Sequence, residues 1–212
     1  MPESSIEPYF SQKLHVESII QHLGHTDIYL LDQIMKGRYS PTDRVLDAGA
    51  GAGRNLHCFV QQGFQVFGTD RDPGAVEQLR LNYPGVPTDH FKVARVEDLP
   101  FPDASFEHVI SSAVLHFAES EAHFEQMFEE MLRVLRPGGS LFIRMTTDVG
   151  LEDKVLALGH GRFYLPDGSE RFLLTRSKLE SLLQKHRLRL LEPFKTVLVE
   201  ELRSMVVVVL ER

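Results

Sequence analysis

The stretch RVLDAGAGAGRN, residues 44–55, constrains the fold more than any other part of the chain. Its apolar start is typical of the end of a buried parallel strand. Gly49, Gly51 and Gly53 then let the backbone turn sharply and approach a ligand, because no Cβ atom stands in the way. A helix is predicted over Arg54–Gln62, with its free N–H groups facing that ligand. The stretch predicts a strand–turn–helix ligand site in an α/β fold.

The glycine spacing and one carboxylate bear on which ligand this is. A dinucleotide site favours Gly-x-Gly-x-x-Gly, but here Arg54 stands where the third glycine is expected. No Gly-Lys-Ser/Thr follows, so a phosphate-binding loop of the nucleotide triphosphatases is also disfavoured. Asp47 would repel a pyrophosphate and would stabilise an ammonium or a sulfonium. The sequence therefore predicts a ligand with positive charge near Asp47, and S-adenosylmethionine fits.

Three stretches in order resemble the class I S-adenosylmethionine-dependent methyltransferases. They are VLDAGAGAG at residues 45–53, EDLPFPDASF at residues 97–106 and RVLRPGG at residues 133–139. The resemblance implies an α/β fold with a Rossmann-like sheet of seven mainly parallel strands, an antiparallel C-terminal strand and helices on both faces. It also implies S-adenosylmethionine as cofactor and S-adenosylhomocysteine as product.

An acidic residue ends the second predicted strand. In nucleotide-binding α/β folds, an acid near this position accepts hydrogen bonds from the ribose hydroxyls. In this chain the residue is Asp70, and because Asp72 and Pro73 already look like a helix start, we expect Asp70 to be spare for the ligand. The family usually has an acid where this chain has Arg95, so the adenine edge is expected to meet Val96 or Glu97. By resemblance we expect the following cofactor-binding residues: Asp47, Ala48, Gly49, Gly51, Arg54, Asn55, Asp70, Arg71, Val96, Glu97 and Ser112.

The acceptor side is expected at the carboxyl ends of the fourth and fifth strands. His116 is the candidate catalytic base, with a structural role as the alternative. Residues 1–40 are expected to form a helical cover and residues 148–174 a substrate-side loop or flap. Within the latter, the turn at residues 166–168 and its flanks predict a hairpin or a mobile flap. The candidate substrate contacts are Tyr9, Arg144, His160, Arg162 and Tyr164.

Periodicity predicts the other elements. Thr26 is expected to cap a helix that ends near Gly37. The unbroken valines at 206–209 predict a strand covered on both faces. The remaining predictions are helices over 5–23, 120–136 and 175–185, a turn over 136–139, and an antiparallel strand pair over 196–199 and 205–210.

Composition limits the class of protein. A chain of 212 residues suffices for one sizeable domain. The net charge of −7 argues against nucleic-acid or membrane-surface binding. No apolar run approaches the roughly 18 residues of a membrane span, and the first ten residues show no secretory signal. A single cysteine, Cys58, allows no internal disulfide, so we expect a cytoplasmic protein. No metal is expected, and the oligomeric state stays open.

The predicted reaction is methyl transfer from the sulfonium to a nucleophile on a small-molecule acceptor. The residues Gly53, Arg54 and Asn55 also resemble the tellurite-resistance-type methyltransferases, which act on small chalcogen compounds. Two alternatives stay open. One is a non-catalytic S-adenosylmethionine-binding protein, which only turnover distinguishes. The other is an NAD-dependent oxidoreductase, which would use the same turn and Asp70.

Overall fold

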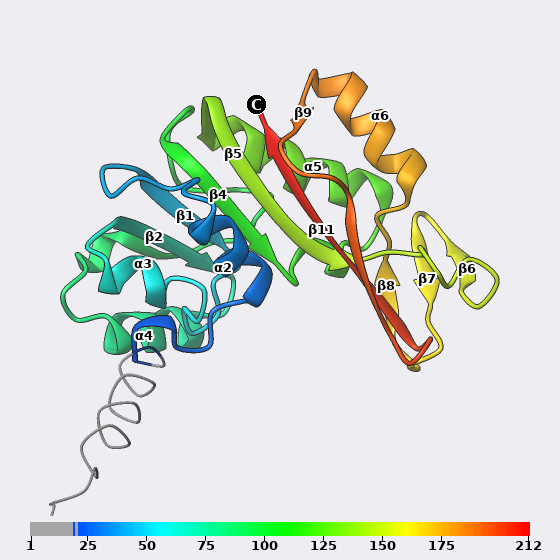
Figure 1. The fold of residues 1–212 in the computed structure, drawn as a ribbon, viewed down its shortest axis with the longest axis horizontal. Helices are drawn as coiled ribbons and strands as arrows, with labels where there is room; N and C mark the ends of the chain where they lie inside the picture. The colour runs from blue at the N-terminus through cyan, green and yellow to red at the C-terminus, as the bar shows by residue number, and fades with distance from the viewer. Residues whose placement is uncertain (1–18, 20) are drawn as a thin grey trace, which may run out of the picture.

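The computed structural model describes residue 19 and residues 21–212 (Figure 1). The α-helices are α2 (Ile28–Met35), α3 (His57–Gln61), α4 (Pro73–Asn82), α5 (Glu121–Val134) and α6 (Arg176–His186), with 3₁₀ turns η1 (Thr88–His90) and η2 (Leu115–Phe117). The strands are β1 (Arg44–Ala48), β2 (Gln65–Asp70), β3 (Phe91–Val93), β4 (Phe106–Ser112), β5 (Leu135–Thr146), β6 (Leu156–Gly159), β7 (Arg162–Tyr164), β8 (Glu170–Phe172), β9 (Arg189–Leu190), β10 (Lys195–Val199) and β11 (Arg203–Glu211).

The large sheet has the strand order β10-β11-β5-β4-β1-β2-β3. Strands β1 to β5 pair in parallel, whereas β11 runs antiparallel to both β5 and β10. The expected mixed sheet with an antiparallel C-terminal strand is thus confirmed, and the short β9 adds an eighth strand beside β11. Because β1 pairs with β2 on one side and β4 on the other, its carboxyl end is a topological switch point, where open α/β sheets bind ligands.

Helices cover both faces of the large sheet, and alternate strand residues point into two separate cores (Figure 1). Val206 and Val208 of β11 join α5 and α6 in one core, and Val207 and Val209 join α2, α3 and α4 in the other. All four valines are at most 2% exposed. The prediction of a doubly covered strand is therefore confirmed.

Two helix starts differ from the sequence prediction. Asp27, not Thr26, is the N-cap of α2, because its carboxylate accepts from the Tyr29 N–H while the Thr26 hydroxyl donates to the Leu23 carbonyl. Helix α3 begins at His57 rather than at residue 54. The backbone of Gly53 has a positive φ of 87°, so the chain makes one more turn, closed by the Leu56 N–H on the Gly53 carbonyl, before the helix begins.

Two segments contain more strand than predicted. Helix α5 ends at Val134, and residues 136–139 belong to β5, where the Gly138 N–H donates to the Arg212 carbonyl and the Gly139 carbonyl accepts from the Arg212 N–H. Residues 156–172 form a three-stranded antiparallel sheet, β6-β7-β8, in which β7 and β8 make the hairpin that was one of the two predictions, while β6 is a strand that was not predicted. Its last strand is anchored in the core because Phe172 is fully buried and stacks on Phe124, with ring centroids 4.5 Å apart. The helix predicted over 5–23 lies largely outside the described residues.

Candidate cofactor and acceptor site

The glycine loop after β1 packs tightly on its neighbours. A Cβ atom on Gly53 would come within 2.6 Å of both Leu79 and Tyr83 of the α4 region. The Tyr83 hydroxyl donates to the Gly53 carbonyl at 2.8 Å. A Cβ atom on Gly49 would meet Val114 at 2.5 Å. Gly53 therefore allows the close helix contact that the third glycine supplies in dinucleotide sites.

Asp47 is a buried carboxylate without a hydrogen-bond partner. It lies near the end of β1, is 1% exposed, and neither of its oxygens accepts a hydrogen bond from any described residue. Burial raises its pKa to about 7, although the Arg54 charge acts in the opposite direction. A buried, unpaired carboxyl group is costly in a folded protein. Its chemistry suits a positively charged ligand at the switch point.

Asp70, at the end of β2, supports the glycine loop. Its Oδ2 accepts from the Gly51 N–H at 2.9 Å, and its Oδ1 accepts from the Asp72 N–H at 3.0 Å. Asp72 caps α4 and Pro73 opens it, as predicted. Asp70 is therefore not wholly spare, but each carboxylate oxygen accepts more than one hydrogen bond. Its side chain still borders the cavity described next.

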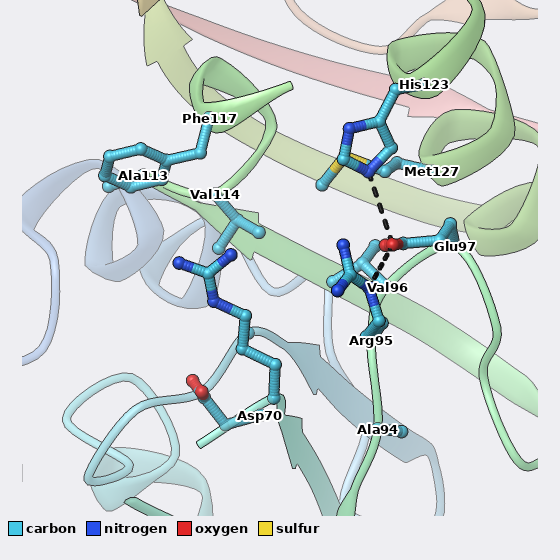
Figure 2. A pocket seen from close by; sticks show the side chains of 12 residues that line it. Asp70, Ala94, Arg95, Val96, Glu97, Ala113, Val114, Phe117, His123 and Met127 are labelled. Atoms are coloured by element: carbon cyan, nitrogen blue, oxygen red, sulfur yellow. Dashed lines mark hydrogen bonds and ion pairs between the residues drawn. The ribbon is translucent and has the colours of Figure 1, made fainter. Parts of the chain in front are cut away.

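A cavity of about 200 Å³ opens beside the glycine loop (Figure 2). Five of the predicted cofactor residues line it: Gly49, Asp70, Arg71, Val96 and Glu97. The sequence analysis did not identify the other residues of its wall as site residues: Ala94, Arg95, Ala113, Val114, Phe117, His123 and Met127. His123 and Met127 come from α5, which the sequence showed only as an amphipathic helix packed on the core.

Glu97 is the partly buried end of a small charged cluster in this cavity. Figure 2 shows its carboxylate between Arg95, to which it is hydrogen-bonded, and His123, whose Nε2 lies 3.3 Å away. Burial acts to raise the pKa of Glu97, but these two partners and a backbone hydrogen bond outweigh it and lower the pKa. Arg95 is thus neutralised by its neighbour, and Glu97 stays ionised as a hydrogen-bond acceptor.

The other predicted cofactor residues lie outside this cavity wall. Asn55 is buried, and its Oδ1 accepts from the Asp27 N–H at 3.1 Å, which ties the glycine loop to α2. Arg54 is half exposed, and its Nη2 lies 4.0 Å from Asp27 Oδ2. Ala48 is fully buried in β1, and Gly51 is held by Asp70. Ser112 is buried at the end of β4 with an unpartnered hydroxyl.

A second, larger cavity of about 600 Å³ adjoins the first, because Ala113 and Phe117 line both. Ala113 follows β4 with a positive φ of 62°, a conformation that is rare for residues other than glycine. Its N–H donates to the Arg144 carbonyl of β5 at 2.7 Å, which holds this turn in place. The wall of the larger cavity consists of Ala113, His116, Phe117, Arg144, Thr146, Asp167, Arg171, Val199, Leu202, Arg203 and Met205.

His116 lies in the wall of the larger cavity and is 7% exposed. Its Nδ1 is buried without a partner among the described residues. Burial lowers its pKa to about 4, and the charges of Arg171, Arg203 and Arg144 act in the same direction. The imidazole is therefore neutral at physiological pH, with a ring nitrogen free to accept a hydrogen bond.

Of the predicted substrate contacts, only Arg144 lines the larger cavity. Arg162 pairs with Glu170 at 3.0 Å, while His160 and Tyr164 are exposed on the small sheet. Tyr9 lies outside the described residues.

The sequence analysis missed three charged residues of this wall: Asp167, Arg171 and Arg203. Asp167 and Arg171 could have been suspected, because both lie in the segment 148–174 that was expected to face the substrate, whereas no sequence signal pointed to Arg203.

Residues 46–143 match the model of a family described as a methyltransferase domain. A probable S-adenosylmethionine-dependent methyltransferase of Mycolicibacterium smegmatis is 35% identical over 99 residues, which cover 47% of this chain and 36% of the relative. The chain therefore matches little more than a third of that relative's length. Within the described part of the chain, no helix has the length and apolar character needed to cross a bilayer.

Solved structures show the same fold. A methyltransferase of this cofactor class from Methanosarcina mazei gives a TM-score of 0.70 at 20% identity, covering 84% of this chain and 96% of that one. The 1,6-didemethyltoxoflavin-N1-methyltransferase of Burkholderia thailandensis, solved with S-adenosylhomocysteine, gives 0.65 at 18% identity, covering 100% and 92%. Residues 46–143 thus match a methyltransferase domain, and the sheet order and the solved structures show that the chain has the fold of S-adenosylmethionine-dependent methyltransferases.

Proposed function

We propose that the chain transfers the methyl group of S-adenosylmethionine to a nucleophile on a small-molecule acceptor. The observation that carries this proposal is the pair of adjoining cavities that share Ala113 and Phe117 at the carboxyl end of β4. One cavity borders the glycine loop and its acids. The other has the volume of a small-molecule site. Two ligands bound in this way would meet at the shared wall.

The smaller cavity offers residues that fit the cofactor. Asp70 and Glu97 supply carboxylate oxygens for hydroxyl and amino groups, and the wall of Val96, Val114 and Met127 supplies apolar contact for a planar base. Asp47 does not line this cavity, but it lies two positions before Gly49, which does, and its orphaned carboxylate would balance the positive charge of the ligand. When bound, the cofactor supplies a methyl group on a sulfonium, which is already a good leaving group.

The protein has mainly to hold the two ligands in line and to exclude water. The positive φ of Ala113 turns the chain after β4 so that Phe117 borders both cavities. We propose His116 as the group that accepts a proton when the acceptor arrives protonated. Its lowered pKa makes it a weak base, since general bases are most efficient with a pKa near the working pH. The contribution of His116 is therefore expected to be smaller than that of positioning.

Calorimetric titration with S-adenosylmethionine, S-adenosylhomocysteine and NAD tests the cofactor. Because Asp70 also supports the loop, the informative variant is Asp70→Asn, which keeps one acceptor oxygen, and the control is Asp89→Asn on the exposed surface. We expect both adenosyl ligands to bind, Asp70→Asn to weaken them about tenfold, and NAD not to bind. Binding of NAD alone would contradict the proposal.

Turnover separates an enzyme from a protein that only binds the cofactor. Tritiated S-adenosylmethionine is incubated with a panel of small molecules, and the label is followed into products. Label in at least one compound, dependent on the protein, is the expected result. The likeness to tellurite-resistance-type enzymes stays a prediction, which tellurite and selenite in the same panel would test.

A further inference from the structure

The larger cavity carries an excess of positive charge that the chain as a whole does not. Three arginines from three different elements line it: Arg144 of β5, Arg171 of β8 and Arg203 of β11. The whole chain has a net charge of −7, so the cluster does not follow from composition. The segments that carry it are far apart in the sequence, and the fold brings them to one wall.

Two of the three arginines are already neutralised. Arg144 Nη1 donates to Asp27 Oδ2 at 2.6 Å, and Asp27 is a buried carboxylate outside the cavity wall. Arg203 Nε donates to Asp167 Oδ2 at 2.6 Å, and Asp167 is the acid of the wall. The positive charges of Arg144 and Arg203 therefore have internal partners.

Arg171 has no carboxylate partner among the described residues. Its Nη1 donates to the Glu170 carbonyl at 2.7 Å, and its guanidinium carbon lies 5.0 Å from the centre of the Phe117 ring. Neither contact removes the charge. The cavity thus holds one uncompensated positive charge, next to a residue that it shares with the cofactor cavity. The lowered pKa of His116, to which Arg171 contributes after burial, is consistent with a positive potential here.

Apart from these charged residues, His116 and Thr146, the wall is apolar. Phe117, Val199 and Leu202 are exposed, and Val199 and Leu202 belong to the β10–β11 hairpin. Large exposed apolar side chains gathered at a cavity are typical of a ligand-binding surface. Met205 adds a flexible apolar contact on the same wall. An occupant of this cavity is expected to have an apolar body.

Resting on the proposed function, we propose that the methyl acceptor carries a carboxylate on an apolar body, and that Arg171 binds this carboxylate. A guanidinium matches a carboxylate in charge and in bidentate geometry. One uncompensated positive charge suits a monoanion, because a phosphate monoester near pH 7 would leave the site negative. Arg171 is thus the specificity-determining residue, and its contact with Phe117 holds it beside the shared wall.

Calorimetry in the presence of saturating S-adenosylhomocysteine tests this proposal with matched probes. The pairs are benzoate with benzamide, hexanoate with hexanamide, and indole-3-acetate with indole-3-acetamide, and phenyl phosphate is the doubly charged comparison. We expect at least one carboxylate to bind at least tenfold more tightly than its own amide and than phenyl phosphate. Arg171→Gln is expected to abolish this preference, and Arg171→Lys to keep part of it.

The control variant is Arg176→Gln. Arg176 makes the same kind of contact, with its guanidinium carbon 4.5 Å from the centre of the Phe194 ring, but it lies on α6 outside the cavity wall. The Arg176→Gln variant is expected to show the same preference for carboxylate over amide probes as the wild type. Unchanged binding of S-adenosylhomocysteine by each variant shows that the variant is folded.

The outcomes separate the two proposals. A wild type that does not bind S-adenosylhomocysteine contradicts the proposed function itself. If that ligand binds but no probe pair shows a carboxylate preference, including the case where no probe binds, the acceptor class is wrong. If phenyl phosphate binds more tightly than every carboxylate probe, the proposal of a monoanionic acceptor is wrong and the site selects a dianion. A preference that survives in Arg171→Gln shows that another residue reads the carboxylate.

Discussion

Asp47→Asn should stabilise the ligand-free protein at high pH while weakening its affinity for the cofactor. The carboxyl group is 1% exposed, has no hydrogen-bond partner among the described residues, and has its pKa raised to about 7 by burial. Between an unfolded-state pKa near 4 and this value, the folded state binds more protons than the unfolded state. Stability therefore falls as pH rises through this range, and the cost remains at higher pH.

The size of the effect follows from the shift. The pKa moves from 3.8 to about 7, and at roughly 1.4 kcal/mol per pKa unit the ionised carboxylate costs on the order of 4 kcal/mol at pH 8. An asparagine amide in the same place still lacks partners, which costs about 1–3 kcal/mol. The net gain expected at pH 8 is therefore about 2 kcal/mol, or roughly 4–8 °C in Tm for a domain of this size. Near pH 5 the variant should gain nothing.

Denaturant unfolding of both proteins at pH 5, 6, 7 and 8, without ligand, measures this difference, and Asp89→Asn on the exposed surface is the control. The same samples are titrated with S-adenosylhomocysteine, whose ammonium loses its counter-charge in the variant. We expect affinity to fall at least tenfold at pH 8, and the wild-type affinity to rise with pH up to about 7 because ligand binding favours ionised Asp47.

A stability difference that stays constant from pH 5 to pH 8 would refute the reasoning, since Asp47 would then not titrate in this range. If Asp47→Asn is more stable but binds S-adenosylhomocysteine as tightly as the wild type, only the contact between Asp47 and the cofactor is refuted. Asp47 would then be a buried, unpaired carboxyl group that destabilises the fold without binding the cofactor.

Three further changes test the loop, the small sheet and the cofactor cavity. Gly53→Ala should destabilise the fold by about 2–4 kcal/mol in denaturant unfolding, because the new Cβ atom meets side chains at 2.6 Å. Gly63→Ala is the control: this glycine also has a positive φ, but the space around it is open, so the cost should be about 1 kcal/mol. Phe172→Ala should cost about 3–5 kcal/mol because the ring is fully buried, and Leu156→Ala on the exposed face of the same sheet should stay within about 0.5 kcal/mol. Glu97→Gln should weaken S-adenosylhomocysteine about tenfold in calorimetry with unfolding unchanged within about 1 kcal/mol, and an unaltered affinity would remove Glu97 from the cofactor site.

The sequence predicted the sheet well because its strands are local, apolar and bounded by clear turns. The valine run of β11 could be assigned to a doubly covered strand, since only burial on both faces tolerates four such residues in succession. Helix starts were harder. The glycine loop needed an extra turn before α3, and a positive φ at Gly53 is not visible in the sequence.

The wall of the smaller cavity, proposed for the cofactor, was partly predictable from the sequence. The wall of the larger cavity, proposed for the acceptor, was not. Motif residues such as Gly49, Asp70 and Glu97 lie close to a loop whose pattern is local. The wall of the acceptor cavity joins residues of β5, β8 and β11, and their meeting depends on how the small sheet packs against the large one. Arg203 and Asp167 become a pair only in three dimensions, 36 positions apart.

The two cavities that share Ala113 and Phe117 draw the rest of their walls from different parts of the sequence. All residues that line the cofactor cavity fall between positions 49 and 127, inside the region 46–143 that matches the family model. The three arginines and the hairpin residues of the larger cavity all lie beyond it, whereas Ala113, His116 and Phe117 of the same wall lie inside it. If the proposed function is right, substitutions in the small sheet and the hairpin would change the acceptor that fits the larger cavity without altering any residue that lines the smaller cavity. Relatives that match only residues 46–143 therefore bear mainly on the smaller cavity, because most of the wall of the larger cavity lies in residues 144–205.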